Sequence, residues 1–411
     1  MSTAKGQPAS SMRTVQQFHV EYASITITLY ESNLTGMHCV VFDQAGPGVD
    51  GYFALATEID DDSGVPHTLE HLCFMGSKFH PNKGQLDKLA TLACSRLNAY
   101  TATDRTVYTL RSAGRNSFAQ ILPVYLEHLI VPSLTDAACY TEVHHIDGEG
   151  KDAGVVYSEM QGVQNAKRTL MGLHAKRLLY SEGNGSRYET GGMMEQLRML
   201  SVERIRAFHE AMYRPENLCL VLVGAIDHIV LHKILENFEK TILDEVPELV
   251  DPFTRPWLGS KATPPLERTT VEKVEFPDED ESMGEMLVGF LGPKRSDRMN
   301  CKALEVLLNY MCGSTVSVIQ NALVEHEELC SAIDYATDMQ PRAAMWLTLS
   351  AIEVEKLETV ETRLFELLKH IAANDFDMAH MQNCIVRMRR RILLKCEDAG
   401  GHFPDQIIED H

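Results

Sequence analysis

The sequence is short of basic residues and of long apolar runs, and each shortage excludes a class of protein. Lys and Arg number 38 against 58 Asp and Glu, and the net charge of −20 argues against nucleic-acid binding, which needs a basic face. No apolar stretch reaches the roughly 20 residues that span a bilayer. The longest, residues 218–226, predicts a buried strand.

Closely paired cysteines are also missing. None of the ten cysteines forms a C-x-x-C pair, and several, such as Cys73 and Cys219, lie between large apolar residues. A small secreted domain held by disulfides has a different pattern. We interpret these residues as mostly buried free thiols in a reducing compartment. The sequence therefore predicts a cytoplasmic location, with the mitochondrial matrix as the alternative.

What is present is typical of a globular protein with more than one domain. Hydrophobic residues make up 44% and charged residues 23% of the 411 positions, a length that suits two or three domains. The acidic charge would attract basic peptides, although a well-solvated surface explains it equally well. The first twenty residues lack acids but carry only Lys5 and Arg13, too little for a clear transit peptide. We predict that residues 1–16 are disordered.

Strand and helix patterns alternate through the first half of the chain. Residues 17–60 alternate in polarity as strands do, and residues 98–111 predict a strand pair. Helical patterns cover residues 86–97 and 118–131, and another long helix is expected to begin near Val155. Mixed elements of this kind indicate an α+β domain.

A proline-rich stretch divides the chain. Five prolines fall within residues 244–267, which predicts a linker, and strands and helices resume after it. We expect an α+β domain over residues 17–245, a linker over 246–267 and a second α+β domain over 268–411. Each domain should pack a mostly antiparallel sheet with helices.

The chemistry is concentrated in one short segment. His67, Glu70 and His71 follow Pro66, which is tolerated in the first turn of a helix. Helix positions i and i+4 are neighbours, so both imidazoles can reach one ion. His-x-x-Glu-His is the inverted form of the zinc-peptidase motif. A helix that holds two histidines by coincidence remains the alternative from spacing alone.

A catalytic zinc ion takes three protein ligands, so a third is required. Glu159, expected on another helix, is the best candidate. Glu142 and Glu149 are rivals, but their charged, glycine-rich surroundings favour a solvated loop. The adjacent pair His144 and His145 suits one ion poorly, because neighbouring side chains point apart. Two histidines and one glutamate predict a Zn²⁺ site.

The surrounding residues resemble the insulinase/pitrilysin family of zinc metallopeptidases. The similarity lies in residues 64–81, in Leu97–Tyr108 with its Leu-Asn-Ala-Tyr-Thr start, in 154–162 and in 213–227. It extends over roughly residues 20–330, and Gly-Val-Val-Tyr-Ser-Glu-Met-Gln-Gly is most similar to the presequence-protease branch.

The resemblance implies a role for each site residue. It implies His67, His71 and Glu159 as zinc ligands and Glu70 as the general base that takes a proton from water. Asp152 lies seven residues before Glu159, where relatives often carry a supporting glutamate.

It also implies that Asn98 and Ala99 lie on the edge strand to which a peptide substrate adds as a further strand. The resemblance further implies that residues 17–245 are the catalytic domain and that the second, homologous domain over 268–411 is truncated. The expected activity is hydrolysis of short or unfolded peptides by a zinc-activated water.

The resemblance also implies a partner. Peptidases of the family enclose substrates between two half-chambers, so we expect a partner subunit or a further C-terminal half to be needed for full activity. Two other functions are open: a scaffold on the same fold that has lost catalysis, and a zinc-binding half that lacks the substrate grip. No nucleic acid or membrane span is expected.

Overall fold

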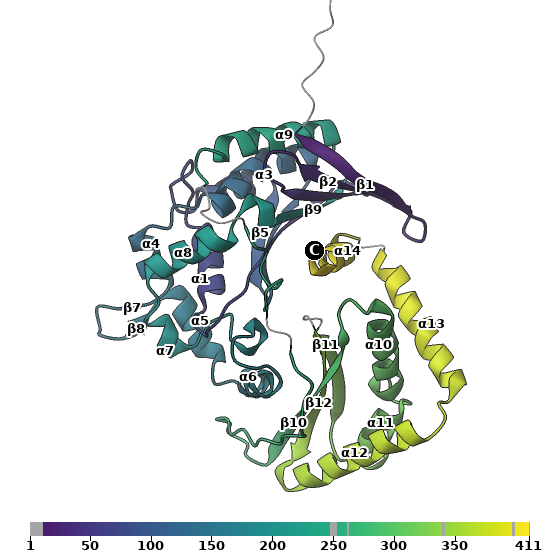
Figure 1. Ribbon diagram of the computed structural model, residues 1–411. Coiled ribbons are helices and arrows are strands. Elements are labelled where there is room, and N and C mark those ends of the chain that lie inside the picture. The colour runs from purple at the N-terminus through teal and green to yellow at the C-terminus, as the bar shows by residue number, and fades with distance from the viewer. Residues whose placement is uncertain (1–10, 247–252, 261–262, 339–341, 397–398, 411) are drawn as a thin grey trace, which may run out of the picture. The chain divides into compact units, whose positions relative to one another are not determined.

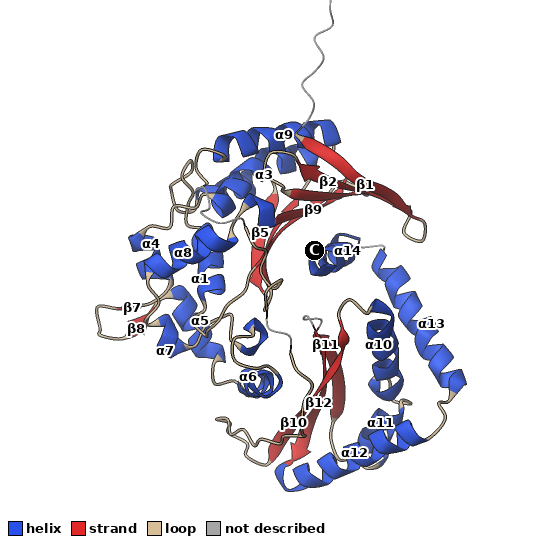
Figure 2. Cartoon of the chain, in the orientation of Figure 1, coloured by secondary structure: helices blue, strands red, loops and turns tan. Residues whose placement is uncertain are grey.

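The computed structural model describes residues 11–246, 253–260, 263–338, 342–396 and 399–410. The chain divides into two compact units (Figure 1). The first comprises the described parts of residues 1–161, 189–259 and 395–411, and the second those of 162–188 and 260–394. The expected α+β class is confirmed, because each unit packs a sheet with helices (Figure 2).

The first unit is built on a seven-stranded sheet of order β1-β2-β3-β9-β4-β6-β5. Its strands are β1 (Met12–Val20), β2 (Ile25–Ser32), β3 (His38–Asp43), β4 (Val49–Ala56), β5 (Ser95–Thr101), β6 (Arg105–Ser112) and β9 (Leu218–Gly224). Neighbours are antiparallel except for the parallel pair of β3 and β9. Strand β5 lies at one edge of the sheet, where substrate binding was predicted.

The central strand β9 is buried along its whole length, as its apolar sequence predicted. Leu218, Leu220 and Leu222 belong to the cluster formed with α1, α3 and α9. Cys219 and Val221 belong to a second cluster, on the other side of the sheet. Both faces of the sheet are therefore covered.

The helices of this unit are mostly on the side of the first cluster (Figure 2). They are α1 (Val65–Cys73), α2 (Gln85–Leu92), α3 (Arg115–Ile130), α4 (Asp136–Glu142), α5 (Val155–Val163), α7 (Met194–Leu197), α8 (Val202–Met212) and α9 (His228–Ile242). A short hairpin of β7 (His145–Ile146) and β8 (Asp152–Ala153) joins α4 to α5.

The opposite face of the first sheet is covered by α14 (Ala399–Asp410), which contacts β9 and β4 (Figure 1). The ring of Phe403 stacks on Phe42 with centroids 5.5 Å apart, and Ile408 joins the same cluster. Tyr100 and Arg105, on β5 and the start of β6, donate hydrogen bonds to Asp405 and Glu409 of α14.

The second unit contains a three-stranded antiparallel sheet of order β10-β12-β11. Its elements are α6 (Lys167–Leu179), β10 (Met283–Lys294), α10 (Arg298–Cys312), α11 (Val318–Gln320), β11 (Ala332–Asp338), β12 (Arg342–Glu353), α12 (Leu357–Ala373) and α13 (Met378–Lys395). The strand expected near 285–291 and the helix expected near 298–311 are confirmed.

The units do not follow the predicted boundaries. Residues 162–188, expected in the first domain, belong to the second unit, where α6 packs against β10. Residues 395–411, expected in the second domain, belong to the first unit. Helix α6, which precedes β9 in the chain, therefore packs on the sheet of the second unit. Helix α14, which follows β12, packs on the sheet of the first unit.

Three local predictions were wrong. The helix expected over 86–97 ends at Leu92, because Cys94 has a positive φ of 51° and residues from Ser95 pair with β6. The long helix expected after Val155 is interrupted at Ala166, whose backbone is extended, and resumes as α6. Met12 to Gln16, expected to be disordered, form part of β1, and residues 1–10 lie outside the described part.

Candidate metal centre and active site

Helix α1 carries three of the predicted site residues. Gly64 precedes the helix with a left-handed φ of 71°, and Pro66 occupies its first turn. Leu69 and Leu72 are buried in the core of the unit, which fixes the rotation of the helix. His67 and His71 therefore project together from the other face.

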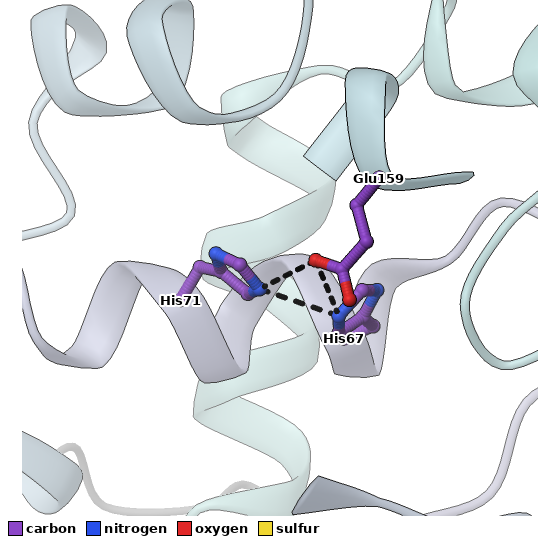
Figure 3. A group of neighbouring side chains, drawn as sticks. All are labelled: His67, His71 and Glu159. Carbon is purple, nitrogen blue, oxygen red and sulfur yellow. Dashed lines mark hydrogen bonds and ion pairs between the residues drawn. The ribbon is translucent and has the colours of Figure 1, made fainter. Parts of the chain in front are cut away.

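The two imidazoles meet the carboxylate of Glu159, which comes from α5 (Figure 3). The Nε2 atoms of His67 and His71 are 3.3 Å apart. Oε2 of Glu159 lies 3.7 Å from the first and 3.6 Å from the second. Residues 88 positions apart in sequence thus form a compact triangle of ligand atoms.

The triangle fits one divalent cation. Zinc bound tetrahedrally at about 2.0–2.1 Å would separate neighbouring ligand atoms by about 3.4 Å, close to the three distances observed. Two imidazole nitrogens and one carboxylate oxygen are donors that zinc accepts. In the described part of the chain no other group of three such side chains comes together.

Glu70 is buried beside the triangle. Its Oε2 accepts a 2.6 Å hydrogen bond from the hydroxyl of Thr101, the last residue of β5. Burial raises the pKa of the Glu70 carboxyl, and the Thr101 hydrogen bond and the nearby histidines oppose that shift. A buried carboxyl beside the ligand triangle is placed to exchange protons with a group bound there.

Glu142 makes a contact that the sequence reasoning missed. It was expected in a solvated loop, but it ends α4 with its side chain only 7% exposed. Its Oε2 lies 3.8 Å from Nδ1 of His71, and Lys83 donates a 3.2 Å hydrogen bond to its Oε1. The nearby His71 imidazole and the Lys83 ammonium, opposed by burial, lower the pKa of the Glu142 carboxyl.

The net electrostatic effect on His71 is in the opposite direction. Burial by itself would lower the pKa of this imidazole, but the carboxylates of Glu142, Glu70 and Glu159 outweigh burial and raise it.

Asp152 lies in a separate polar cluster next to α5. It accepts hydrogen bonds from His144 Nε2 at 2.7 Å, from Arg198 Nη2 at 2.8 Å and from the Tyr157 hydroxyl at 3.2 Å. These bonds, led by that from Arg198, hold the pKa of Asp152 well below its usual range. Tyr157 is two residues before Glu159, so any support from Asp152 reaches the ligand through α5.

The remaining rivals are accounted for. Glu149 is exposed in the turn of the hairpin, where Lys151 is its ion-pair partner. Nδ1 of His145 lies 3.0 Å from the backbone oxygen of Tyr140, and Nε2 of His144 is hydrogen-bonded to Asp152. The two adjacent histidines therefore have different partners. Neither lies in the ligand triangle.

Asn98 and Ala99 lie in the edge strand β5, whose residues pair on one side with β6. The backbone oxygen of Asn98 accepts a 3.1 Å hydrogen bond from the Tyr125 hydroxyl, which ties the strand to α3. Among the strands that the structure describes, none pairs with the other side of β5. The edge is therefore placed as strand addition would require.

Gly191 and Gly192 pack between the start of α1 and helix α5, the two helices that carry the ligand candidates. A Cβ on Gly64 would lie 2.6 Å from both the Gly191 oxygen and Gly192 Cα. A Cβ on Gly191 would lie 2.7 Å from the sulfur of Met160, next to Glu159. The backbone at 191–192 therefore fits between the start of α1 and α5 only because side chains are missing.

The chain matches two family models, "Insulinase (Peptidase family M16)" over residues 56–171 and "Peptidase M16 inactive domain" over residues 200–386. The first match contains all three ligand candidates and Glu70. This chain belongs to the M16 (insulinase/pitrilysin) family, as the resemblance predicted.

Relatives and structures agree with that assignment. An uncharacterized protein of Saccharomyces cerevisiae is 39% identical over 97% of this chain and 38% of its own length. Presequence protease 1, chloroplastic/mitochondrial, of Arabidopsis thaliana is 26% identical over 85% of this chain and 33% of its own length.

The crystal structure of a protease from Helicobacter pylori has the same fold, with a TM-score of 0.72, 16% identity and coverage of 98% of this chain and 90% of that one.

This chain spans less than two fifths of the length of the curated relatives named above. None of the ten cysteines forms a disulfide, and eight of them are buried, as expected. No helix in the described part is both long and apolar enough to cross a membrane.

Proposed function

We propose that this chain is the zinc-binding catalytic half of a metallopeptidase that hydrolyses short or unfolded peptides. The observation that carries the proposal is the triangle of His67, His71 and Glu159 with Glu70 buried at its side. These are the four groups that peptide hydrolysis by a metal centre requires: three ligands and one proton carrier.

The residues divide the work as follows. His67, His71 and Glu159 would hold the ion, which when bound lowers the pKa of its water to about 7 and polarises the scissile carbonyl. Glu70 takes the proton from the attacking water and returns it to the leaving amine. Thr101 holds the Glu70 carboxylate in place before the proton arrives.

We propose that substrate binds by adding a strand to β5 beside Asn98 and Ala99. The free edge offers backbone hydrogen bonds, which tolerate many substrate sequences. A second half-chamber, from a partner subunit or a further part of a longer protein, would complete the enclosure. The many buried thiols suit a reducing compartment, so we propose the cytoplasm, with the mitochondrial matrix as the alternative.

A second candidate function is a partner half without catalysis. The match of residues 200–386 to the "Peptidase M16 inactive domain" model favours it. The intact ligand triangle with Glu70 favours the catalytic alternative.

Glu70→Gln separates these functions. We expect the wild-type and variant chains each to bind one zinc ion, measured by metal analysis after gel filtration. Cleavage of a mixed set of quenched fluorescent peptides should fall about 10²- to 10⁴-fold, the usual contribution of a general base.

Glu149→Gln, which removes an exposed carboxylate outside the site, serves as the control and should cleave as the wild type does. Full activity in Glu70→Gln would refute the proposed role of Glu70. If the wild-type chain and both variants bind zinc but none of them cleaves, the chain is a zinc-binding half that lacks the substrate grip, and the search moves to the second half-chamber.

A further inference from the structure

We propose that Glu142 is a positioning residue that orients the His71 imidazole for metal binding. This inference rests on the proposed zinc site. The His71 ring has two nitrogens, and each faces a carboxylate. Nε2 lies 3.6 Å from Oε2 of Glu159, inside the ligand triangle, and Nδ1 lies 3.8 Å from Oε2 of Glu142.

The position of Glu142 is fixed by the short helix that carries it. Thr135 caps α4 by accepting a hydrogen bond from the Ala138 backbone N–H, and Cys139 and Val143 are buried in the core. With its side chain 7% exposed, the Glu142 carboxylate cannot turn freely to solvent. Lys83 holds its other oxygen, which leaves Oε2 for His71.

A carboxylate in this place has a defined effect on the ring. A negative charge facing Nδ1 favours the proton on that nitrogen, so it selects the tautomer in which Nε2 presents its lone pair to the ion. The negative charge on the Nδ1 side also raises the basicity of Nε2, so the imidazole donates its electron pair to the metal more strongly. The metal ligand is thus aligned before the ion arrives.

The second histidine has no equivalent support. Nδ1 of His67 is buried and has no hydrogen-bond partner among the described residues. Asp152, predicted as the supporting carboxylate, bonds His144, Arg198 and Tyr157 instead. The supporting carboxylate of the imidazole pair is therefore Glu142, which comes from α4.

The test is Glu142→Gln, which keeps the size of the side chain and removes its charge. A second carboxylate–histidine pair in the same unit provides the matched control. Glu127 lies 2.8 Å from Nδ1 of His80, outside the ligand triangle. Glu127→Gln therefore breaks a similar pair without touching a ligand.

Zinc affinity is measured by competition with a chromophoric chelator, and the thermal midpoint of each zinc-free protein is recorded alongside. We expect Glu142→Gln to weaken zinc binding about 10- to 100-fold, the usual effect of removing such a partner. Glu127→Gln should leave zinc affinity unchanged, even if it lowers the thermal midpoint of the protein.

Each other outcome overturns a specific statement. Unchanged zinc affinity in Glu142→Gln, with tight binding by the wild type, overturns the role of Glu142 and leaves the proposed function intact. Equal weakening by both variants shows that the effect is general loss of structure. A wild-type chain that binds no zinc overturns the proposed metal site, and this inference with it.

Discussion

Two glycines with the same backbone shape make a stringent test of how the metal site is held. Gly64 precedes α1 with φ 71°, and Gly84 precedes α2 with φ 75°. A Cβ added to Gly84 would meet no atom within 4 Å among the described residues outside the adjoining chain, whereas a Cβ on Gly64 would lie 2.6 Å from the backbone of 191–192. Replacement by alanine therefore separates backbone strain from close packing.

The expected magnitudes follow from these contacts. Alanine in the left-handed region costs about 1–2 kcal/mol, which should be the whole loss for Gly84→Ala. Gly64→Ala adds the cost of overpacking, about 1–3 kcal/mol, because backbone atoms cannot move aside as a flexible side chain can. The combined loss should be about 2–5 kcal/mol, the sum of strain and overpacking.

Urea unfolding followed by circular dichroism gives the free energies of unfolding, and chelator competition gives zinc affinity. Gly64→Ala should also weaken zinc binding, because His67 is three residues away, while Gly84→Ala should not. If both variants lose the same stability and bind zinc equally well, the packing of 191–192 does not position α1.

Three further predictions concern stability and metal dependence. Phe403→Ala should destabilise the first unit by about 3–5 kcal/mol in urea, because it removes a buried ring stacked on Phe42; the exposed Gln406→Ala on the same helix should cost little, and equal losses would refute the role of the ring. Burial lowers the pKa of His209 to about 4, so below its unfolded value of 6.5 the unfolded chain takes up a proton that the folded chain does not. Stability should therefore fall between pH 6.5 and 4, by up to about 3 kcal/mol for this group, and His209→Gln should flatten that part of a pH series of urea melts; an unchanged slope would contradict it. Removing zinc with a chelator should abolish peptide cleavage and adding zinc should restore it, while activity that survives complete removal would refute the metal mechanism.

The sequence predicted best what depends on local spacing. His67, Glu70 and His71 lie within one helix, so their proximity follows from helical geometry alone. The apolar run of β9 likewise predicted burial, because both of its faces are covered. Glu159 was predicted as the third ligand from its sequence context and from the family resemblance, and the structure brings it to the two histidines.

What the sequence could not provide depends on contacts between distant segments. Glu142 resembles a solvated acid in a charged region, and only the packing of α4 against α1 brings it to His71. Its position three residues after Cys139, a buried residue on the same helix, was the available signal. Likewise, residues 95–97 follow a helical pattern, but pairing with β6 makes them a strand.

The late position of α14 in the sequence, far from the strands that it covers, has a consequence for folding during synthesis. The apolar face of the first sheet is complete once β9 has been synthesised, at Gly224, but its cover begins at Ala399. At about 5–20 residues per second, ribosomes need roughly 10–35 s to reach α14. During that interval Phe42 and Val221 lie on an uncovered surface, so a nascent chain of this kind should depend on chaperones until α14 emerges.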